Sequence, residues 1–294
     1  MLPKFELIKP QSLQEVVDSL NRWGEDARVL AGGTDVIVQM REGKSKPKYL
    51  IDIKGIAELN GIRLVDDALW IGSLTTHREL ECSDTVRKKF PLLYDGVSKV
   101  GSVQVRNRGT IGGNICSALP SADSAAPLLA LDAAVRLYGP EGGRELQLAD
   151  FFLGPGKTAL KVGEILTQII VKLPVGNSSG AYYKYARREA MDLALLGIAI
   201  YLECEDDLST CREARIALAT AAPTPIRAFQ AETALKGRLL SETLLEQAGA
   251  IASDEARPRT SWRSSADFRK HLVKVLVPRA GMMAWERIKQ QEAD

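Results

Sequence analysis

A short glycine-rich segment near the start of the chain has the composition of a phosphate-binding loop. Its centre is Ala31-Gly32-Gly33-Thr34-Asp35, preceded by an apolar stretch typical of a strand. Glycines let a backbone turn sharply and approach a ligand closely, and consecutive N–H groups in such a turn form a concave site for phosphate. Thr34 can add a hydroxyl donor, and Asp35 would brace the loop by accepting backbone N–H groups. The segment also suits a plain tight turn, and it lacks the GxGxxG pattern of Rossmann folds.

A second glycine-rich segment, Thr110-Ile111-Gly112-Gly113-Asn114, follows 80 residues after the first. It again combines two glycines with a hydroxyl and an amide, so the two loops together would hold the two ends of one extended dinucleotide. Asp123 follows among small residues. It would either cap the next helix or bind a sugar hydroxyl of a cofactor. The small side chains around it would leave room for a flat ring system.

Strands and helices must position these loops, and the apolar periodicity predicts where they lie. Before residue 173, helices are expected at 12–23, 75–81 and 90–100 and directly after residue 123, and a loop is expected at 102–123. Strands are expected in the same part of the chain at 28–31, 49–53, 68–73, 134–138 and 165–171. The turn-rich segment 173–180 is the expected domain boundary. After it, strands at 181–187, 195–203 and 214–220 precede helices at 226–235, 241–253 and 264–289. That order favours an α+β domain with helices on one face of an antiparallel sheet.

Composition excludes several classes of function. The 294 residues suffice for two ordinary domains. A net charge of +2 gives no general attraction to nucleic acid or anionic membranes, and 6% aromatic residues disfavour a base-stacking surface. The N-terminus does not resemble a signal peptide, and no window approaches the ~20 apolar residues of a membrane span. A cytoplasmic location is therefore expected.

The cysteines and histidines do not indicate a metal site or a catalytic constellation. Cys82, Cys116, Cys204 and Cys211 form no CxxC pair, whereas zinc and iron–sulfur sites need clustered thiolates. Reduced thiols are the expectation. The two histidines lie far apart in the sequence and within helix-like segments. We therefore predict no metal ligands and no catalytic side chain in this chain.

The two glycine-rich segments, in this order and spacing, closely resemble those of the flavoprotein subunits of the xanthine dehydrogenase and carbon monoxide dehydrogenase family, which are molybdenum hydroxylases. The resemblance runs through the whole chain, and the last two of its further segments are similar to the bacterial xanthine dehydrogenase type. These segments are Gly154-Pro155-Gly156-Lys157, Tyr183-Lys184-Tyr185-Ala186-Arg187-Arg188, Ala221-Ala222-Pro223-Thr224-Pro225-Ile226-Arg227 and Ser261-Trp262-Arg263. The chain lacks the four-cysteine insertion of the branch that resembles the 4-hydroxybenzoyl-CoA reductase flavoprotein, so FAD is its only expected cofactor.

The resemblance implies an α+β fold with two domains. Residues 1–175 would form a two-part FAD-binding domain of the vanillyl-alcohol-oxidase (PCMH) type, and residues 181–290 a smaller domain of the carbon monoxide dehydrogenase flavoprotein C-terminal type, with an antiparallel sheet and helices.

The resemblance also implies a set of FAD contacts. The first segment would wrap the FAD pyrophosphate, the second would form another backbone cradle, and Asp123 would contact the ribityl or adenosine side. Leu166 would pack near the flavin. Lys184 would reach the flavin edge from the second domain, where a cation favours a reduced, anionic flavin. The complete implied set is Val29, Leu30, Ala31, Gly32, Gly33, Thr34, Asp35, Val36, Thr110, Gly112, Gly113, Asn114, Asp123, Leu166 and Lys184.

The function implied is electron transfer within a heterotrimer or its dimer. A large subunit with molybdopterin would hydroxylate a purine, an aldehyde, an N-heterocycle or carbon monoxide. A small subunit with [2Fe-2S] clusters would pass the electrons to FAD on this chain, and NAD+ would accept them. Two alternatives make different predictions. A self-sufficient flavin oxidoreductase would turn over an organic substrate as an isolated chain, and a nucleotide-binding regulatory module would bind adenine nucleotides without flavin reduction.

Overall fold

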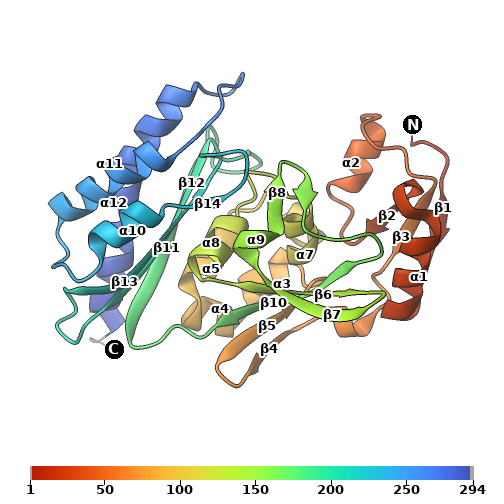
Figure 1. Ribbon diagram of the computed structural model, residues 1–294, viewed down its shortest axis with the longest axis horizontal. Helices are drawn as coiled ribbons and strands as arrows, with labels where there is room; N and C mark the ends of the chain where they lie inside the picture. Colours follow the sequence, from red (N-terminus) through yellow and green to blue (C-terminus); the bar gives the residue numbers. More distant parts are fainter. Residues whose placement is uncertain (1, 292–294) are drawn as a thin grey trace.

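The computed structural model describes residues 2–291, which form three units in chain order (Figure 1). The N-terminal unit is a parallel sheet of order β1-β3-β2. Its elements are β1 (Glu6–Ile8), α1 (Leu13–Trp23), η1 (Gly24–Asp26), β2 (Ala27–Leu30), α2 (Val36–Arg41) and β3 (Tyr49–Asp52). Ser12 begins α1, because its hydroxyl accepts from the backbone N–H of Glu15 at 3.3 Å. A small core that includes Val16 and Ile51 joins α1 to the sheet.

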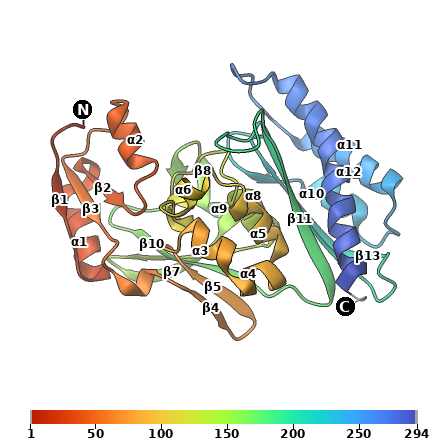
Figure 2. The same ribbon diagram turned by 180° about the vertical axis from the view of Figure 1, so that it is seen from behind.

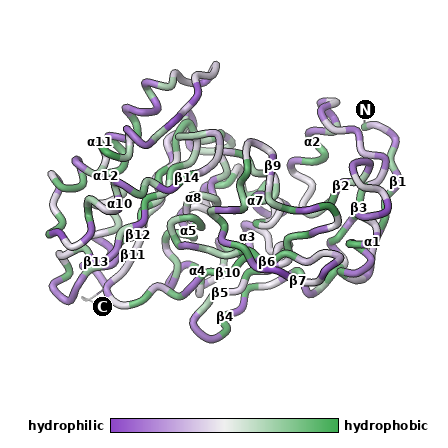
Figure 3. The backbone as a smooth tube through the Cα atoms, in the orientation of Figure 1, coloured by the Kyte–Doolittle hydropathy of each residue, from purple (hydrophilic) through white to green (hydrophobic). Residues whose placement is uncertain are grey.

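The middle unit is a five-stranded antiparallel sheet of order β4-β5-β10-β6-β7, with short helices packed against it. Its strands are β4 (Ile62–Val65), β5 (Ala68–Gly72), β6 (Ala134–Gly139), β7 (Gly142–Gln147) and β10 (Ile165–Lys172), with the small pair β8 (Phe152–Gly154) and β9 (Lys157–Thr158) beside them. Its helices are η2 (Ala57–Leu59), α3 (His77–Cys82), α4 (Asp84–Lys89), α5 (Pro91–Ser98), α6 (Val103–Arg106), α7 (Ile111–Cys116), α8 (Ala125–Ala130) and α9 (Leu148–Phe151). The turn between β4 and β5 is hydrophilic and projects from the unit (Figure 3).

The C-terminal unit is a four-stranded antiparallel sheet with three helices on one face (Figure 2). Its elements are β11 (Asn177–Tyr185), β12 (Leu196–Cys204), β13 (Cys211–Ala219), β14 (Ile226–Arg227), α10 (Phe229–Leu235), α11 (Glu242–Glu255) and α12 (Ala266–Gln291). Side chains alternate between the two faces of a strand. Ile198 and Ile200 therefore pack under the helices, whereas Ala199 and Tyr201 join the core of the middle unit.

One arginine near the end of α12 ties the middle and C-terminal units together. Arg287 donates to the Asp95 carboxylate in α5, with Nη1 2.7 Å from Oδ2, and to the carbonyl of Gly180 at 2.6 Å. The backbone N–H of Tyr182 donates to the same carboxylate at 3.2 Å. Hydrogen bonds that involve a charged group contribute about 1.5–3 kcal/mol each. The middle unit and the C-terminal sheet are therefore held in a fixed relation.

Most of the predicted elements are present, but three expectations about local structure are wrong. Residues 102–123 are not a continuous loop, because Ser102 and Thr110 cap the short helices α6 and α7. The expected boundary at 173–180 ends early, since β11 starts at Asn177 and pairs along its full length with β12. The segment 226–235 begins as strand β14, and α10 starts only at Phe229.

Neither a membrane-spanning helix nor a metal-binding cluster is found in residues 2–291. No helix there combines the length and apolar character needed to cross a membrane. No group of three or more His, Cys, Asp or Glu side chains is arranged to hold a metal ion.

Candidate functional site

The first glycine-rich segment connects β2 to α2 and leaves several backbone donors free. In the described part of the chain, no acceptor receives a hydrogen bond from the N–H groups of Gly32, Gly33, Thr34 or Asp35. Gly33 has a φ of +81°, which L side chains rarely adopt. Successive free N–H groups in a half-buried turn form an anion-binding concavity.

The two glycine-rich segments are in direct contact. A methyl group on Gly32 would overlap the carbonyl oxygen of Arg108 and lie 3.1 Å from Cα of Gly109. Across the same contact, the hydroxyl of Ser117 donates to Oδ2 of Asp35 at 2.5 Å. Asp35 thus braces the loop as expected, but through a side-chain hydroxyl from after α7 and not through backbone N–H groups.

The second segment contributes differently from the expected backbone cradle. The N–H of Ile111 donates to Thr75 O at 2.9 Å and that of Gly112 to Ser73 O at 3.0 Å. The N–H of Gly113 donates to the hydroxyl of Thr110, and the N–H of Asn114 donates to the carbonyl of Thr110. These donors are occupied because the segment is a capped helical turn anchored to the end of β5. Its available polar group is the side-chain amide of Asn114, whose Oδ1 accepts from Ser124 at 2.7 Å.

Asp123 and Lys184 form a buried ion pair across the contact between the two domains. Nζ of Lys184 lies 2.7 Å from Oδ2 of Asp123 and 2.9 Å from the carbonyl of Lys99. The two side chains are only 8% and 7% exposed, and the phenol of Tyr182 donates to Oδ1 of Asp123 at 2.8 Å. Burial raises the pKa of Asp123 to about 6, although Lys184 acts in the opposite direction. The N-cap residue of α8 is Ser124 and the helix has no side-chain cap, so Asp123 does not cap α8, the alternative that the sequence left open.

Leu166 lies in β10, inside the fold and below the second segment. It is 2% exposed and belongs to the same core as Ile111 and Ile115 of α7. The structure thus places it as a buried packing residue of the middle unit, and its expected position near the flavin stays a prediction.

A buried histidine that the sequence did not single out underlies both segments. The backbone N–H of His77 donates to Gly109 O at 3.0 Å. A methyl group on Gly109 would lie 3.5 Å from Cδ2 of His77 and 3.5 Å from Oγ1 of Thr34. The Nδ1 atom of His77 has no hydrogen-bond partner in the described chain. Burial, followed by the charge of Arg106, lowers the pKa of His77 to about 4.

We expect His77 to make the protein less stable in acid. Its pKa is lower in the folded state than in the unfolded state, where it is near 6.5. Its contribution is therefore complete above pH 6.5 and is lost as the pH falls towards 4, by about 3 kcal/mol. Urea unfolding of the native protein and of His77→Gln between pH 7.5 and 4 measures this. The difference in the free energy of unfolding between the native protein and His77→Gln should change by about 3 kcal/mol between pH 7.5 and pH 4. A difference that did not depend on pH would refute a buried neutral His77.

Sequence patterns point to some of the missed residues and not to others. Tyr182 lies two positions before the predicted Lys184 on the same strand, so the two share a face, and the strand period alone could have pointed to Tyr182. His77, Lys99 and Ser117 carry no such signal, because their contacts come from segments that are distant along the chain.

Known proteins match nearly the whole chain. Residues 3–174 match the family described as the FAD binding domain in molybdopterin dehydrogenase. Residues 181–284 match the carbon monoxide dehydrogenase flavoprotein C-terminal domain. The chain is 37% identical to a xanthine dehydrogenase FAD-binding subunit of Escherichia coli O157:H7, with 92% of this chain and 94% of that protein covered. It is 34% identical to the carbon monoxide dehydrogenase medium chain of Hydrogenophaga pseudoflava, with 97% and 98% covered.

Solved structures with the same fold include a carbon monoxide dehydrogenase chain and a quinoline 2-oxidoreductase chain. A chain of the carbon monoxide dehydrogenase from Hydrogenophaga pseudoflava that lacks the Mo-pyranopterin moiety superposes with a TM-score of 0.94, at 35% identity over 98% of this chain and 99% of that one. A chain of quinoline 2-oxidoreductase from Pseudomonas putida 86 gives 0.92, at 30% identity over 98% and 99%. These matches confirm the predicted α+β architecture of an FAD-binding domain followed by a smaller flavoprotein C-terminal domain.

Proposed function

We propose that this chain, which belongs to the family of FAD-binding subunits of molybdenum hydroxylases, carries electrons within a multi-subunit dehydrogenase. In this proposal it binds FAD, receives electrons from a partner subunit with [2Fe-2S] clusters and passes them to NAD+. Relatives named as a FAD-binding subunit and as medium chains support a role beside larger and smaller partners. The large partner would hold molybdopterin and bind the substrate. The cytoplasmic location and the domain limits 1–175 and 181–290 stay predictions.

The observation that carries this proposal is the set of free N–H groups at residues 32–35. A pyrophosphate needs several donors on one concave surface, and a backbone turn supplies them without adding a positive charge. The close approach of Gly32 to the backbone of Arg108 and Gly109 leaves no room for a side chain where the two loops meet. The residues present therefore fit the diphosphate of a dinucleotide.

The other predicted residues have separate tasks in holding the cofactor. The amide of Asn114 would donate to the cofactor beside the first loop. The carboxylate of Asp123 would accept from a cofactor hydroxyl, and the ammonium of Lys184 would favour negative charge nearby. Both lie where the middle unit meets the C-terminal sheet, so the cofactor would be shared between the two domains. Bound FAD supplies the two-electron redox chemistry, and the chain supplies binding, orientation and charge.

Purification of the full chain tests flavin binding directly. We expect a yellow protein from which heat denaturation releases FAD and not FMN, in about one copy per chain. The complex with its partners should reduce NAD+ when a substrate of the large subunit is added. Absence of flavin from both the chain and the complex would refute the proposal.

The same preparation separates the alternatives. A self-sufficient oxidoreductase would oxidise an organic substrate as the isolated chain, whereas the proposed subunit would show only weak NADH-dependent dye reduction. A regulatory module would bind ATP or ADP but would leave an added flavin oxidised.

A further inference from the structure

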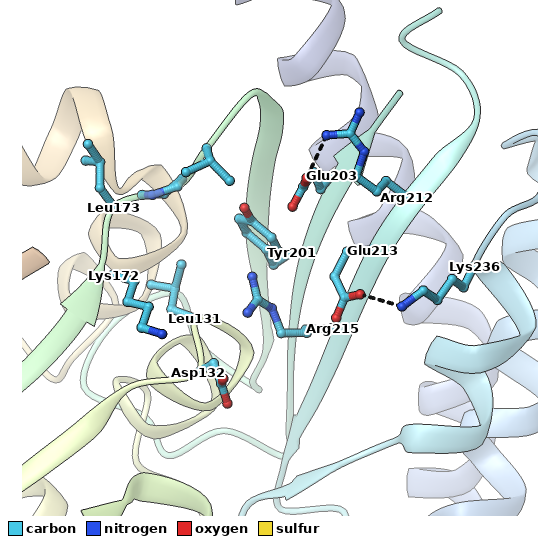
Figure 4. Close-up of a pocket in the computed structure, with 12 residues that line it drawn as sticks. Leu131, Asp132, Lys172, Leu173, Tyr201, Glu203, Arg212, Glu213, Arg215 and Lys236 are labelled. Carbon is cyan, nitrogen blue, oxygen red and sulfur yellow. Dashed lines mark hydrogen bonds and ion pairs between the residues drawn. The ribbon is translucent and has the colours of Figure 1, made fainter. Parts of the chain in front are cut away.

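A second cavity lies between the two domains, away from the glycine-rich segments. It has a volume of about 470 Å³, within the range of small-molecule sites. The middle unit contributes Leu131, Asp132 and Lys172, and the C-terminal sheet contributes Tyr201 and Arg215 (Figure 4). Tyr201 is four residues further along β12 than Gly197, the partner of Lys184, a separation of about 13 Å along the strand. No residue of either glycine-rich segment lines this cavity.

Two cations extend into this cavity without an acidic partner. Within residues 2–291, neither Lys172 nor Arg215 takes part in an ion pair or donates a side-chain hydrogen bond. The guanidinium of Arg215 lies 4.3 Å from the centre of the Tyr201 ring, and its Nε is buried without any partner. Figure 4 shows both side chains pointing into the space between β13 and the end of β10. A buried polar group without a partner requires an explanation, and a bound ligand is one.

The other two cations that line the cavity are paired with its two glutamates. Arg212 lies 3.2 Å from Glu203, and Lys236 lies 3.1 Å from Glu213 (Figure 4). Asp132 is exposed and lies 3.7 Å from Arg227, whose guanidinium also pairs with Glu232. The two unpaired cations, Lys172 and Arg215, therefore give the cavity a preference for a negatively charged ligand. Carboxylate and phosphate groups suit it best, because the planar guanidinium of Arg matches their geometry.

Further unpaired donors and an apolar wall define the rest of the site. A smaller adjoining cavity of about 20 Å³ shares Leu131, Pro174 and Tyr201 with the first and is also lined by Ser178 and Ser179. The hydroxyls of both serines are buried without partners. Ser178 and Ser179 are consecutive in β11, so their hydroxyls point to opposite faces of the sheet, and only that of Ser178 lies on the face towards the middle unit. Thus two of the six unpartnered buried side-chain atoms of the described chain, Oγ of Ser178 and Nε of Arg215, lie on this side of the sheet. The apolar wall consists of Leu131, Leu173, Pro174 and Val175.

We propose that this cavity is a binding site for a small amphipathic anion, an organic carboxylate or phosphate whose apolar part rests on the Leu131–Val175 wall. Its anionic group would sit between Lys172 and Arg215. Because these residues belong to different domains, the ligand would bridge the middle unit and the C-terminal sheet. Binding would then stabilise their docked arrangement by mass action. The proposal is independent of the flavin function, since the site shares no residue with it.

Calorimetric titration with phenyl phosphate tests the site in the full chain saturated with FAD, so that the first loop is occupied. We expect saturable binding of phenyl phosphate, weaker binding of inorganic phosphate, and none of phenol or benzylamine. Benzoate separates the two sources of anion, because comparable binding indicates a carboxylate ligand and its failure indicates a phosphate ligand. No saturable binding of either aromatic anion would overturn the proposal.

Variants place the binding at this cavity. We expect Arg215→Met to weaken phenyl phosphate at least tenfold and Lys172→Met about fivefold, with Arg215→Lys between native and Arg215→Met. Lys274→Met is the matched control for Lys172→Met, because it removes a positive charge from another exposed lysine, in α12 on the opposite face of the C-terminal sheet. It should bind as the native chain does. Lys172→Met alters only an exposed side chain, so this variant should fold. If both Arg215→Met and Lys172→Met bound phenyl phosphate with the native affinity, the assignment of the site to this cavity would be overturned.

Discussion

Replacement of Gly32 by alanine should lower the affinity for FAD by at least tenfold. The added methyl group would overlap the carbonyl oxygen of Arg108 and lie 2.8 Å from its carbonyl carbon. Both are backbone atoms, so the two loops must separate to accept it. Such overpacking costs about 1–3 kcal/mol of stability, and it also displaces the N–H groups at residues 32–35. Fluorescence titration of the flavin-free chain with FAD measures the affinity, and urea unfolding without FAD measures the stability.

Gly55→Ala is the control for this experiment. No atom lies within 4 Å of a methyl group at Gly55, and its backbone is not in the left-handed region. It should bind FAD as the native chain does and should be equally or slightly more stable. If Gly32→Ala kept the native FAD affinity, the contact between the two segments would not shape the binding site.

Replacement of Lys184 by methionine should destabilise the protein by about 3–5 kcal/mol at pH 8, because it leaves the buried carboxylate of Asp123 unpaired. The double variant Asp123→Asn/Lys184→Met should recover much of this loss, since neither charge then remains. A double-mutant cycle based on urea unfolding measures the coupling. The exposed pair Asp84–Arg87, with side chains 76% and 60% exposed, should show a coupling below about 1 kcal/mol. An equal coupling energy in the Asp123–Lys184 and Asp84–Arg87 pairs would show that burial of the first pair does not strengthen its interaction.

The pH dependence of the Lys184→Met variant follows from Asp123. The pKa of Asp123 is raised in the native fold from 3.8 to about 6, so its contribution is complete below pH 3.8 and is lost as the pH rises through 6. Without Lys184, the main influence that lowers this pKa is gone, and the pKa rises further. The stability deficit of Lys184→Met should therefore be small at pH 4.5 and large at pH 8. A deficit that did not depend on pH would show that Lys184 acts through packing alone.

Part of the site could be predicted because its signals are local. Two glycines after a strand, with a threonine and an aspartate, indicate a tight turn that suits a phosphate, and the likeness to the flavoprotein family favours that use over a plain turn. The strands and the long last helix of the C-terminal domain likewise follow from the spacing of apolar residues over short stretches of sequence. Helices α6 and α7 were missed because each is shorter than two turns and depends on one capping hydroxyl, Ser102 or Thr110. A polar, glycine-containing stretch does not distinguish such turns from a loop.

The sequence by itself determined the two glycine-rich segments, the α+β order of the elements and the likeness to a flavoprotein family. Only the tertiary structure decided how the segments work. It left the N–H groups at residues 32–35 free and used those of residues 111–114 to anchor the second segment to β5. It also joined Asp123 to Lys184, which are 61 residues apart, and left Lys172 and Arg215 facing one cavity. The physical reason is that backbone hydrogen bonds and buried charges are satisfied by whatever the fold brings near, and sequence distance does not limit that choice.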